Sequence, residues 1–292
     1  MVKTKKQQVE KLTIKEYWEK HAPQIWYSDK EPLSIEWFNE IEYKRYNLYL
    51  ECFNEMFEYE YHYKEKVLEI GCGVGTDLVR FAKNGALCSA IDLTEFAIET
   101  TKKHFELKNL KYEELLVADA EDLPFNDNTF DLVISFGVIH HTPDIQKCVN
   151  EIYRVLKPEG SAIILIYSRG WKHYFKRVFI NGILLGGLIR YGYSRLINRQ
   201  TEVHGNSPLT YVHKKREVKK LFNIFGELKI YRKRMGEYFD YAPWRSRKLP
   251  RWLTNIVYLF TLEKVFGELF IIKVIKADPK PRISLFKSLF KP

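Results

Sequence analysis

The stretch VLEIGCGVGTD, residues 67–77, limits the possible folds more than any other part of the sequence. A short apolar run leads into three glycines within five positions, Gly71, Gly73 and Gly75, and then into the start of a helix. Glycines at such a turn permit positive φ and let a ligand approach the backbone, while the helix start offers unpaired N–H groups. The pattern indicates a strand–loop–helix unit that binds a ligand at its loop.

Predicted strands and helices alternate along the chain from this stretch onward. Five runs rich in Val, Ile and Leu have the length and apolar density of buried parallel strands. They are residues 66–70, 86–93, 111–120, 130–137 and 161–167. Helices are expected between them; the first ends at Gly85, and another begins after Thr94, a residue that favours helix N-termini. This order predicts a doubly wound parallel sheet, whose ligands lie outside the carboxyl ends of the strands.

Length, apolar content and cysteine spacing narrow the class of protein. A chain of 292 residues with 46% apolar residues can bury a full core. The basic N-terminus has no apolar stretch behind it, unlike a secretory signal, and no run reaches the roughly 18 apolar residues of a membrane-spanning helix. Four cysteines without a C-x-x-C pair argue against a zinc site and a disulfide framework. We expect a cytoplasmic protein without a bound metal.

The net charge of +10 hides an asymmetry along the chain. Residues 169–292 contain 27 of the 47 Lys and Arg residues but only 8 of the 37 Asp and Glu residues, so residues 1–168 are acidic overall. Such a split indicates contact with an anionic partner, either nucleic acid, lipid headgroups or a phosphorylated substrate. A solvated basic surface without a partner is the alternative.

An acidic residue at the end of the second strand indicates the class of ligand. Asp92 follows Gly71 by 21 residues, where a carboxylate can accept hydrogen bonds from both hydroxyls of a ribose. Nicotinamide dinucleotides and S-adenosylmethionine both contain a ribose. The glycine spacing is G-x-G-x-G rather than G-x-G-x-x-G, and Asp77 places a negative charge where a pyrophosphate would bind. The dinucleotide is therefore disfavoured.

Four segments together resemble a known family. VLEIGCGVGTD, IDLTEFAIE, VADAEDLPFNDNTFDLVISFGVIHHTPD and EIYRVLKPEGSAIILIY are similar to the successive motifs of class I S-adenosylmethionine-dependent methyltransferases, of the group that includes the ubiquinone and menaquinone methyltransferases. The resemblance covers roughly residues 64–168 and extends more loosely to EYW near the N-terminus and to residues 205–222. It implies S-adenosylmethionine as the cofactor, S-adenosylhomocysteine as its product, and a Rossmann-like seven-stranded sheet with the last strand antiparallel.

The family fold also implies how the rest of the chain is organised around this core. The sixth and seventh strands are expected at residues 227–235 and 268–276. The implied segments are an N-terminal helical lid (1–63), the cofactor-binding core (64–168), a substrate-side helical insertion (169–226), the last two strands with a connecting insertion (227–276) and a basic amphipathic tail (277–292).

The resemblance assigns cofactor contacts to residues at the strand ends. Asp92 would hold the ribose hydroxyls with Leu93 against the adenine, and Asp119 and Ala120 would meet the adenine edge. The residues implied to line the methionine part or to pass beside the sulfonium are Glu69, Gly71, Cys72, Gly73, Gly75, Phe136 and Gly137.

Two histidines after the fourth strand, His140 and His141, are candidates for a catalytic base. They stand where the acceptor must enter, and imidazole titrates near neutral pH. The alternative is that they orient loops by hydrogen bonds, as paired histidines at this place in the family also do. Asp144 is interpreted as a charge at a helix N-terminus rather than as a catalyst.

The N-terminal segment and the apolar stretches of the basic half concern the acceptor and its surroundings. Aromatic residues between 14 and 63 suit a lid over a flat or apolar acceptor, or else pack that lid onto the domain. Arg45 is a candidate partner for the cofactor carboxylate. Residues 178–189 and 282–292 combine apolar and basic residues, which favours contact with an anionic membrane surface; a core helix and a docked or disordered tail are the alternatives.

Three functions follow. The first is a methyltransferase acting by in-line displacement on a small, hydrophobic acceptor such as a quinone precursor or a lipid. The second is an RNA methyltransferase that uses the basic half as a phosphate track, although the sequence contains no recognisable RNA-binding appendix. The third is a regulator that binds S-adenosylmethionine without turnover.

Overall fold

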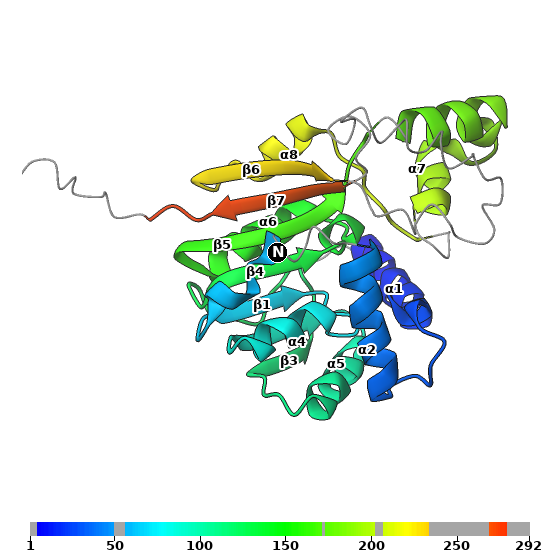
Figure 1. The fold of residues 1–292 in the computed structure, drawn as a ribbon. Helices are drawn as coiled ribbons and strands as arrows, with labels where there is room; N and C mark the ends of the chain where they lie inside the picture. The colour runs from blue at the N-terminus through cyan, green and yellow to red at the C-terminus, as the bar shows by residue number, and fades with distance from the viewer. Residues whose placement is uncertain (1–4, 50–55, 171–172, 202–206, 234–268, 279–292) are drawn as a thin grey trace, which may run out of the picture.

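The computed structural model describes residues 5–49, 56–170, 173–201, 207–233 and 269–278, and the predicted tail segment 282–292 lies outside them. One seven-stranded sheet runs through it in the order β3-β2-β1-β4-β5-β7-β6 (Figure 1). β1 to β5 are parallel, and β7 is antiparallel to both β5 and β6. The strands are β1 (Lys66–Ile70), β2 (Leu87–Asp92), β3 (Glu114–Val117), β4 (Phe130–Phe136), β5 (Leu156–Tyr167), β6 (Glu227–Lys233) and β7 (Leu269–Ile275). The predicted fold class is confirmed.

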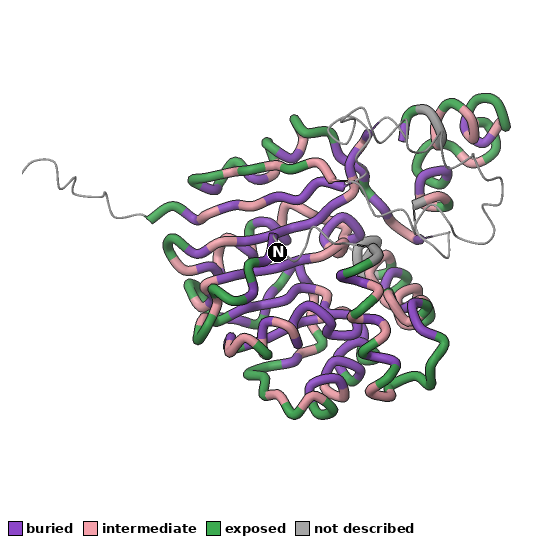
Figure 2. The backbone as a smooth tube through the Cα atoms, viewed as in Figure 1, coloured by how far each residue is buried: buried purple, intermediate pink, exposed green. Residues whose placement is uncertain are grey.

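Alternating side chains along the strands build two separate cores, one on each face of the sheet. Val67 and Leu68, successive residues of β1, point into different cores. The first core is covered by α2 (Ile35–Lys44), α4 (Thr76–Lys83) and α5 (Glu95–Leu107), and the second by α6 (Ile145–Val155) and α8 (Lys215–Leu221). Figure 2 shows the buried strands between these layers. Burial on both faces explains the near-continuous apolar runs from which the strands were predicted.

Two strands differ in length from their predictions for local reasons. β3 covers only four residues because its pairing partner β2 ends at Asp92, which lies opposite Val117. β5 begins earlier than predicted, since Leu156 already pairs with Phe130 across a shift in register. Within that irregular stretch, a Cβ on Gly160 would come within 2.9 Å of the Lys157 carbonyl oxygen, so the position accepts only glycine without movement.

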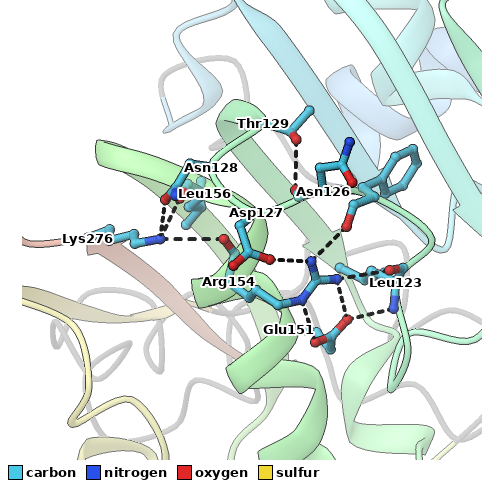
Figure 3. A network of polar contacts seen from close by, with 10 residues as sticks. Leu123, Asn126, Asp127, Asn128, Thr129, Glu151, Arg154, Leu156 and Lys276 are labelled. Atoms are coloured by element: carbon cyan, nitrogen blue, oxygen red, sulfur yellow. Dashed lines mark hydrogen bonds and ion pairs between the residues drawn. The ribbon is translucent and has the colours of Figure 1, made fainter.

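A polar network joins β7 to α6 and to the loop before β4 (Figure 3). Lys276 Nζ donates to the Leu156 carbonyl at 2.7 Å and to Asn128 Oδ1 at 2.8 Å. Arg154 donates to the carbonyl oxygens of Leu123 and Phe125 and pairs with two carboxylates of its surroundings, those of Glu151 and Asp127. The network supplies partners for loop carbonyl groups on the side of the sheet away from the glycine loop.

The strand order reverses between β1 and β4, which places the ligand site at their carboxyl ends. The segments around this edge are α1 (Lys5–Lys20), η1 (Ile25–Tyr27), η2 (Arg45–Tyr49), η4 (Ile139–His141), η5 (His173–Leu184) and α7 (Gly187–Thr201), whereas η3 (Tyr59–His62) leads into the start of β1. Figure 1 shows α1 and α7 beyond this edge of the sheet. Helices from both ends of the sequence therefore frame one site.

Candidate cofactor and acceptor site

The glycine loop between β1 and α4 is built so closely that side chains are excluded from it. Gly71 has φ +79°, and a Cβ there would lie 2.2 Å from a methyl carbon of Val138. Gly75 has φ +73°, and a Cβ there would lie 2.8 Å from a methyl carbon of Thr101. The Gly71 N–H donates to the Ile91 carbonyl at 2.7 Å, which fixes the loop to the end of β2. The loop therefore needs glycine both for its dihedral angles and for its packing.

Asp92 is held at the end of β2 with both carboxylate oxygens engaged. Oδ2 accepts from the Gly73 N–H at 3.1 Å, and Oδ1 accepts from the Thr94 N–H at 2.9 Å and from its hydroxyl at 2.8 Å. Burial raises the pKa of Asp92 above its ordinary value of 3.8, although these hydrogen bonds act to lower it. The carboxylate is thus fixed beside the glycine loop, as a ribose-binding group must be, and Leu93 is half-buried directly after it.

Glu69 and Cys72 lie buried beneath the same loop. One carboxylate oxygen of Glu69, Oε2, has no hydrogen-bond partner among the described residues. Burial and the nearby Asp77 carboxylate raise the pKa of Glu69 well above 4.5, with Arg45 opposing them. The Cys72 thiol accepts from the Thr101 hydroxyl at 3.3 Å. An unpartnered buried acceptor beside a bare backbone loop fits the ammonium group of S-adenosylmethionine, so the residues present suit this cofactor.

Arg45 differs from its expected role, because the structure gives its guanidinium a partner within the chain. Arg45 Nε donates to Asp77 Oδ1 at 3.0 Å, a second nitrogen donates to Oδ2, and the Tyr46 hydroxyl donates to Oδ1. Burial alone would lower the pKa of Arg45, but the charge and hydrogen bonds of Asp77 raise it above its ordinary value. The negative charge that the sequence places at the helix start is thus paired with Arg45 within the chain. Pairing of Arg45 with the cofactor carboxylate stays a prediction.

At the predicted adenine edge, the structure adds a residue that the sequence did not indicate. Lys11 of α1 places Nζ 2.5 Å from Asp119 Oδ2 and 2.5 Å from Glu121 Oε2. Asp119 Oδ1 accepts from the Glu121 N–H at 3.0 Å, and Ala120 is buried between the two acidic residues. The first helix is thereby attached to the carboxylate expected to meet the adenine.

At the end of β4, Phe136 and Gly137 lead into the histidine pair. The Arg45 guanidinium lies 5.0 Å from the centre of the Phe136 ring. Gly137 has φ +73°, and its N–H donates to the Leu165 carbonyl at 3.1 Å. A Cβ on Gly137 would lie 3.9 Å from His140 Cε1. The predicted sulfonium neighbours and the candidate bases thus occupy one corner of the site.

His140 and His141 have different surroundings although they are adjacent. His140 is fully buried, and neither ring nitrogen has a hydrogen-bond partner among the described residues. Burial lowers the pKa of His140 well below 6.5, and His141 and His213 add to the effect. His141 Nδ1 lies 2.7 Å from the Leu209 carbonyl oxygen, so Nδ1 is the protonated nitrogen and Nε2 carries the lone pair. Of the two rings, His141 is the one that a hydrogen bond to the strap holds in a fixed orientation.

Aromatic rings flank this pair. The Trp18 ring of α1 meets His141 edge-on at a centroid distance of 5.0 Å, and the Tyr167 ring lies 4.3 Å from His140. Trp37 and Phe38 of the same N-terminal segment are buried in the first core and serve packing, whereas Tyr43 is exposed. Trp18 is the ring that meets the candidate base.

Residues 207–213, here called the strap, cross the histidine pair. The Tyr211 N–H donates to the His140 carbonyl at 2.9 Å, and Leu209 accepts from His141. Asn198 of α7 clamps the strap, donating to the Pro208 carbonyl at 3.0 Å and accepting from the Thr210 N–H at 3.1 Å. The strap falls within the segment of looser family resemblance, which is the only sequence signal that indicated it.

Asp144 has the structural role expected for it. Its side chain accepts from the Lys147 N–H at 3.2 Å and caps the N-terminus of α6. It is thereby a helix cap rather than part of the site.

The geometry agrees with comparisons to known proteins. A protein-family model described as a methyltransferase domain matches residues 68–164. The ubiquinone/menaquinone biosynthesis C-methyltransferase UbiE of Rickettsia felis is 37% identical over 118 residues, which are 38% of this chain and 47% of that protein. The demethylmenaquinone methyltransferase of Clavibacter sepedonicus is 36% identical over 123 residues, 39% of this chain and 49% of that protein. The chain spans about half the length of these curated relatives.

A solved structure extends the likeness in fold to nearly the whole chain. The magnesium protoporphyrin IX methyltransferase ChlM from Synechocystis PCC 6803, solved with bound S-adenosylhomocysteine, matches with a TM-score of 0.54 at 14% identity. The match covers 92% of this chain and 100% of that chain. At this identity the likeness concerns the fold alone. From the family model over residues 68–164, the relatives and the sheet, we conclude that the chain carries a class I S-adenosylmethionine-dependent methyltransferase domain, similar in sequence to ubiquinone and menaquinone methyltransferases, with S-adenosylmethionine as its cofactor.

Proposed function

We propose that the protein transfers a methyl group from S-adenosylmethionine to a small, hydrophobic acceptor, such as a quinone precursor. The observation that carries the proposal is the position of His141. Its ring is buried between Trp18 and the strap, at the end of β4, in the same corner as the residues assigned to the sulfonium. A base with an aromatic neighbour suits a flat acceptor with an ionisable hydroxyl or carbon.

The chain's own residues divide the work of binding and transfer. Asp92 and the glycine loop hold the nucleoside, and Glu69 Oε2 accepts from the ammonium group. The bound cofactor supplies an electrophilic methyl carbon, whose thioether leaving group is neutral. The protein therefore needs mainly to align the acceptor with that carbon and to exclude water. α1 and the strap cover the corner in which this happens.

His141 acts as the general base that accepts a proton from the acceptor. Its Nδ1–H is fixed by the Leu209 carbonyl, so Nε2 takes the proton from the acceptor's hydroxyl or acidic carbon as the new bond to the methyl group forms. His140 remains neutral at physiological pH because burial disfavours its charged form. Its part is to fill the corner beside Gly137 and to keep His141 in place through their ring contact of 4.2 Å.

The names of the relatives support a quinone-like acceptor. Two of them are described as enzymes of ubiquinone or menaquinone methylation. The aromatic ring of Trp18 and the apolar surroundings of η4 agree with such an acceptor. Within the basic half of the chain, only the strap and Asn198, which orient His141, are assigned a part in the transfer.

The proposal is tested with methyl-labelled S-adenosylmethionine and a cell extract divided into a lipid fraction and an RNA fraction. We expect label in organic-soluble product with wild-type protein. His141→Asn keeps a donor for the Leu209 carbonyl but has no base, so we expect it to lose about a hundredfold in rate while binding the cofactor normally. Label in the RNA pellet that ribonuclease removes would contradict the proposal. Cofactor binding without label in either fraction would favour the non-catalytic regulator.

A further inference from the structure

The helices η5 and α7 form a compact hairpin at the edge of the site. A Cβ on Gly182 would lie 2.9 Å from Leu188 Cγ, and one on Gly187 would lie 2.9 Å from Leu196 Cδ1. These two glycines are therefore required for close packing of η5 on α7. Gly186 between them has φ +68°, and a Cβ there would meet no atom within 4 Å, as suits a turn. The predicted apolar stretch 178–189 is thus a helix–turn–helix, and not one core helix.

The turn of this hairpin exposes a group of aliphatic side chains. Residues 183–189, here called the apolar tip, include Ile183 (59% exposed), Leu184 (63%), Leu185 (73%) and Ile189 (96%). Phe179, one turn earlier in η5, is 45% exposed. Figure 2 shows how much of the hairpin is exposed beside the buried sheet. Clustered aliphatic exposure of this kind marks a site of contact with a partner or a membrane.

The charges around the apolar tip all have the same sign. No Asp or Glu occurs from residue 170 to residue 201, whereas this stretch holds six Lys and Arg residues. Arg190, Arg195 and Arg199 are exposed, and the guanidinium groups of Arg190 and Arg199 lie 5.3 and 4.7 Å from the centre of the Tyr191 ring. An aliphatic group within a stretch of sequence that carries only basic charges fits the acyl boundary and the phosphate headgroups of an anionic bilayer.

The hairpin is also coupled to the acceptor side of the site. Asn198 of α7 clamps the strap, whose Leu209 carbonyl orients His141. Figure 1 shows α7 beyond the edge of the sheet where β1 and β4 end. None of the helices in the described residues has the length and apolar content to cross a bilayer. Insertion of the apolar tip into the bilayer interface agrees both with the coupling of α7 to the strap and with the lack of a spanning helix among the described residues.

We propose that the apolar tip inserts into the interface of an anionic phospholipid bilayer while the neighbouring arginines bind its headgroups. The inference goes beyond the proposed function and does not depend on it, because lipid binding is measured without an acceptor. RNA is the less suitable partner, since phosphate contacts give no role to four exposed aliphatic side chains. A second copy of the chain is disfavoured by the like charges that such a contact would bring together.

The test is co-sedimentation of the full chain with vesicles of phosphatidylcholine alone or with 30% phosphatidylglycerol, in 100 mM salt. Wild-type protein should bind the anionic vesicles and be released as the salt concentration rises. Leu184→Ser/Ile189→Ser should weaken binding about tenfold or more. Arg190→Gln/Arg195→Gln should weaken it by about fivefold for each arginine. The matched controls are Leu107→Ser/Ile224→Ser, two exposed aliphatics elsewhere, and Lys219→Gln/Lys220→Gln of α8, with near wild-type binding expected.

Three results would overturn the inference. The first is a wild-type chain that does not bind anionic vesicles. The second is binding that both tip variants retain, which would place the lipid contact elsewhere on the basic half. The third is a tip variant that loses RNA binding or dimer mass while its vesicle binding is unchanged. Circular dichroism and cofactor affinity of each variant show that the fold is intact, so loss of binding in the tip variants alone supports the proposal.

Discussion

Lys11 Nζ lies 2.5 Å from Asp119 Oδ2, so an ion pair ties the first helix to the carboxylate expected at the adenine edge. The pair is largely shielded, with 14% of the lysine side chain and 21% of the aspartate side chain exposed. The same helix carries Trp18 to His141 at the other end of the site. α1 therefore spans the region between the predicted adenine contacts and the candidate base.

Removing this tie should weaken cofactor binding. We expect Lys11→Met to lower the affinity for S-adenosylmethionine by about three- to tenfold, mainly through faster dissociation, because a partly buried pair is worth about 1 kcal/mol or somewhat more. Lys15→Met is the matched control, since its pair with Glu95 is more exposed. Stopped-flow fluorescence measures both rates. Tighter binding by Lys11→Met would show that Lys11 competes with the adenine instead.

The buried pair of Arg45 and Asp77 should matter more for stability than for chemistry. Asp77→Asn leaves a buried guanidinium without its counter-charge, so we expect a loss of about 3–5 kcal/mol in the free energy of unfolding. Glu42→Gln removes the more exposed pairs with Lys83 and Lys108 and should cost about 1 kcal/mol or less. Urea titration compares them. A small loss in Asp77→Asn would mean that Arg45 is readily rehydrated.

Buried neutral histidines should make the protein sensitive to mild acid. Burial lowers the pKa of His104 to about 4 and that of His213 to about 4. In the unfolded chain these residues take up protons below about 6.5, whereas the folded chain does so only near pH 4. Stability is therefore fully present above pH 6.5 and is lost as the pH falls towards 4.

The slope of this pH dependence can be tested with a single substitution. His104→Asn keeps a donor for the Val74 carbonyl but does not titrate, so the fall in unfolding free energy between pH 6.5 and 4 should be shallower by about 1.4 kcal/mol per pH unit. Urea unfolding across this pH range gives the slope. An unchanged slope would show that His104 is protonated in the folded state.

Asn198 should position the strap without touching the cofactor. Asn198→Ala removes two side-chain hydrogen bonds to the strap, so we expect a loss of about tenfold in kcat with unchanged affinity for S-adenosylmethionine. Asn181→Ala in η5 removes a single bond to Gln200 and is the matched control. Steady-state kinetics on the labelled product separates kcat from KM. A loss confined to cofactor affinity would contradict a positioning role.

The sequence indicated which residues come together at the glycine loop because these residues follow local rules. Gly71 and Gly73 follow β1 and Asp92 ends β2, and the strand order brings them to one edge. The contacts that α1 and the strap make across the site obey no such rule. Lys11 is 108 residues from Asp119, and His141 is 68 residues from Leu209, so no spacing or periodicity connects the partners.

Burial explains the other differences between the sequence analysis and the structure. A single sequence does not show that Arg45 packs against Asp77, so the ion pair between them was not predicted. Residues 178–189 have the composition of a core helix, yet Gly186 breaks them at the turn and leaves the tip exposed. Tertiary contact, not local propensity, decides both cases.

The most direct test of the cofactor site, on which the proposed function rests, is calorimetric titration of S-adenosylmethionine into wild-type protein and Asp92→Ala. Asp29→Ala, an exposed aspartate, is the control. If Asp92 holds the ribose hydroxyls, the variant loses two hydrogen bonds to a charged group, and Kd should rise about a hundredfold while the control is unchanged. Equal Kd values for wild-type protein and Asp92→Ala would contradict the account.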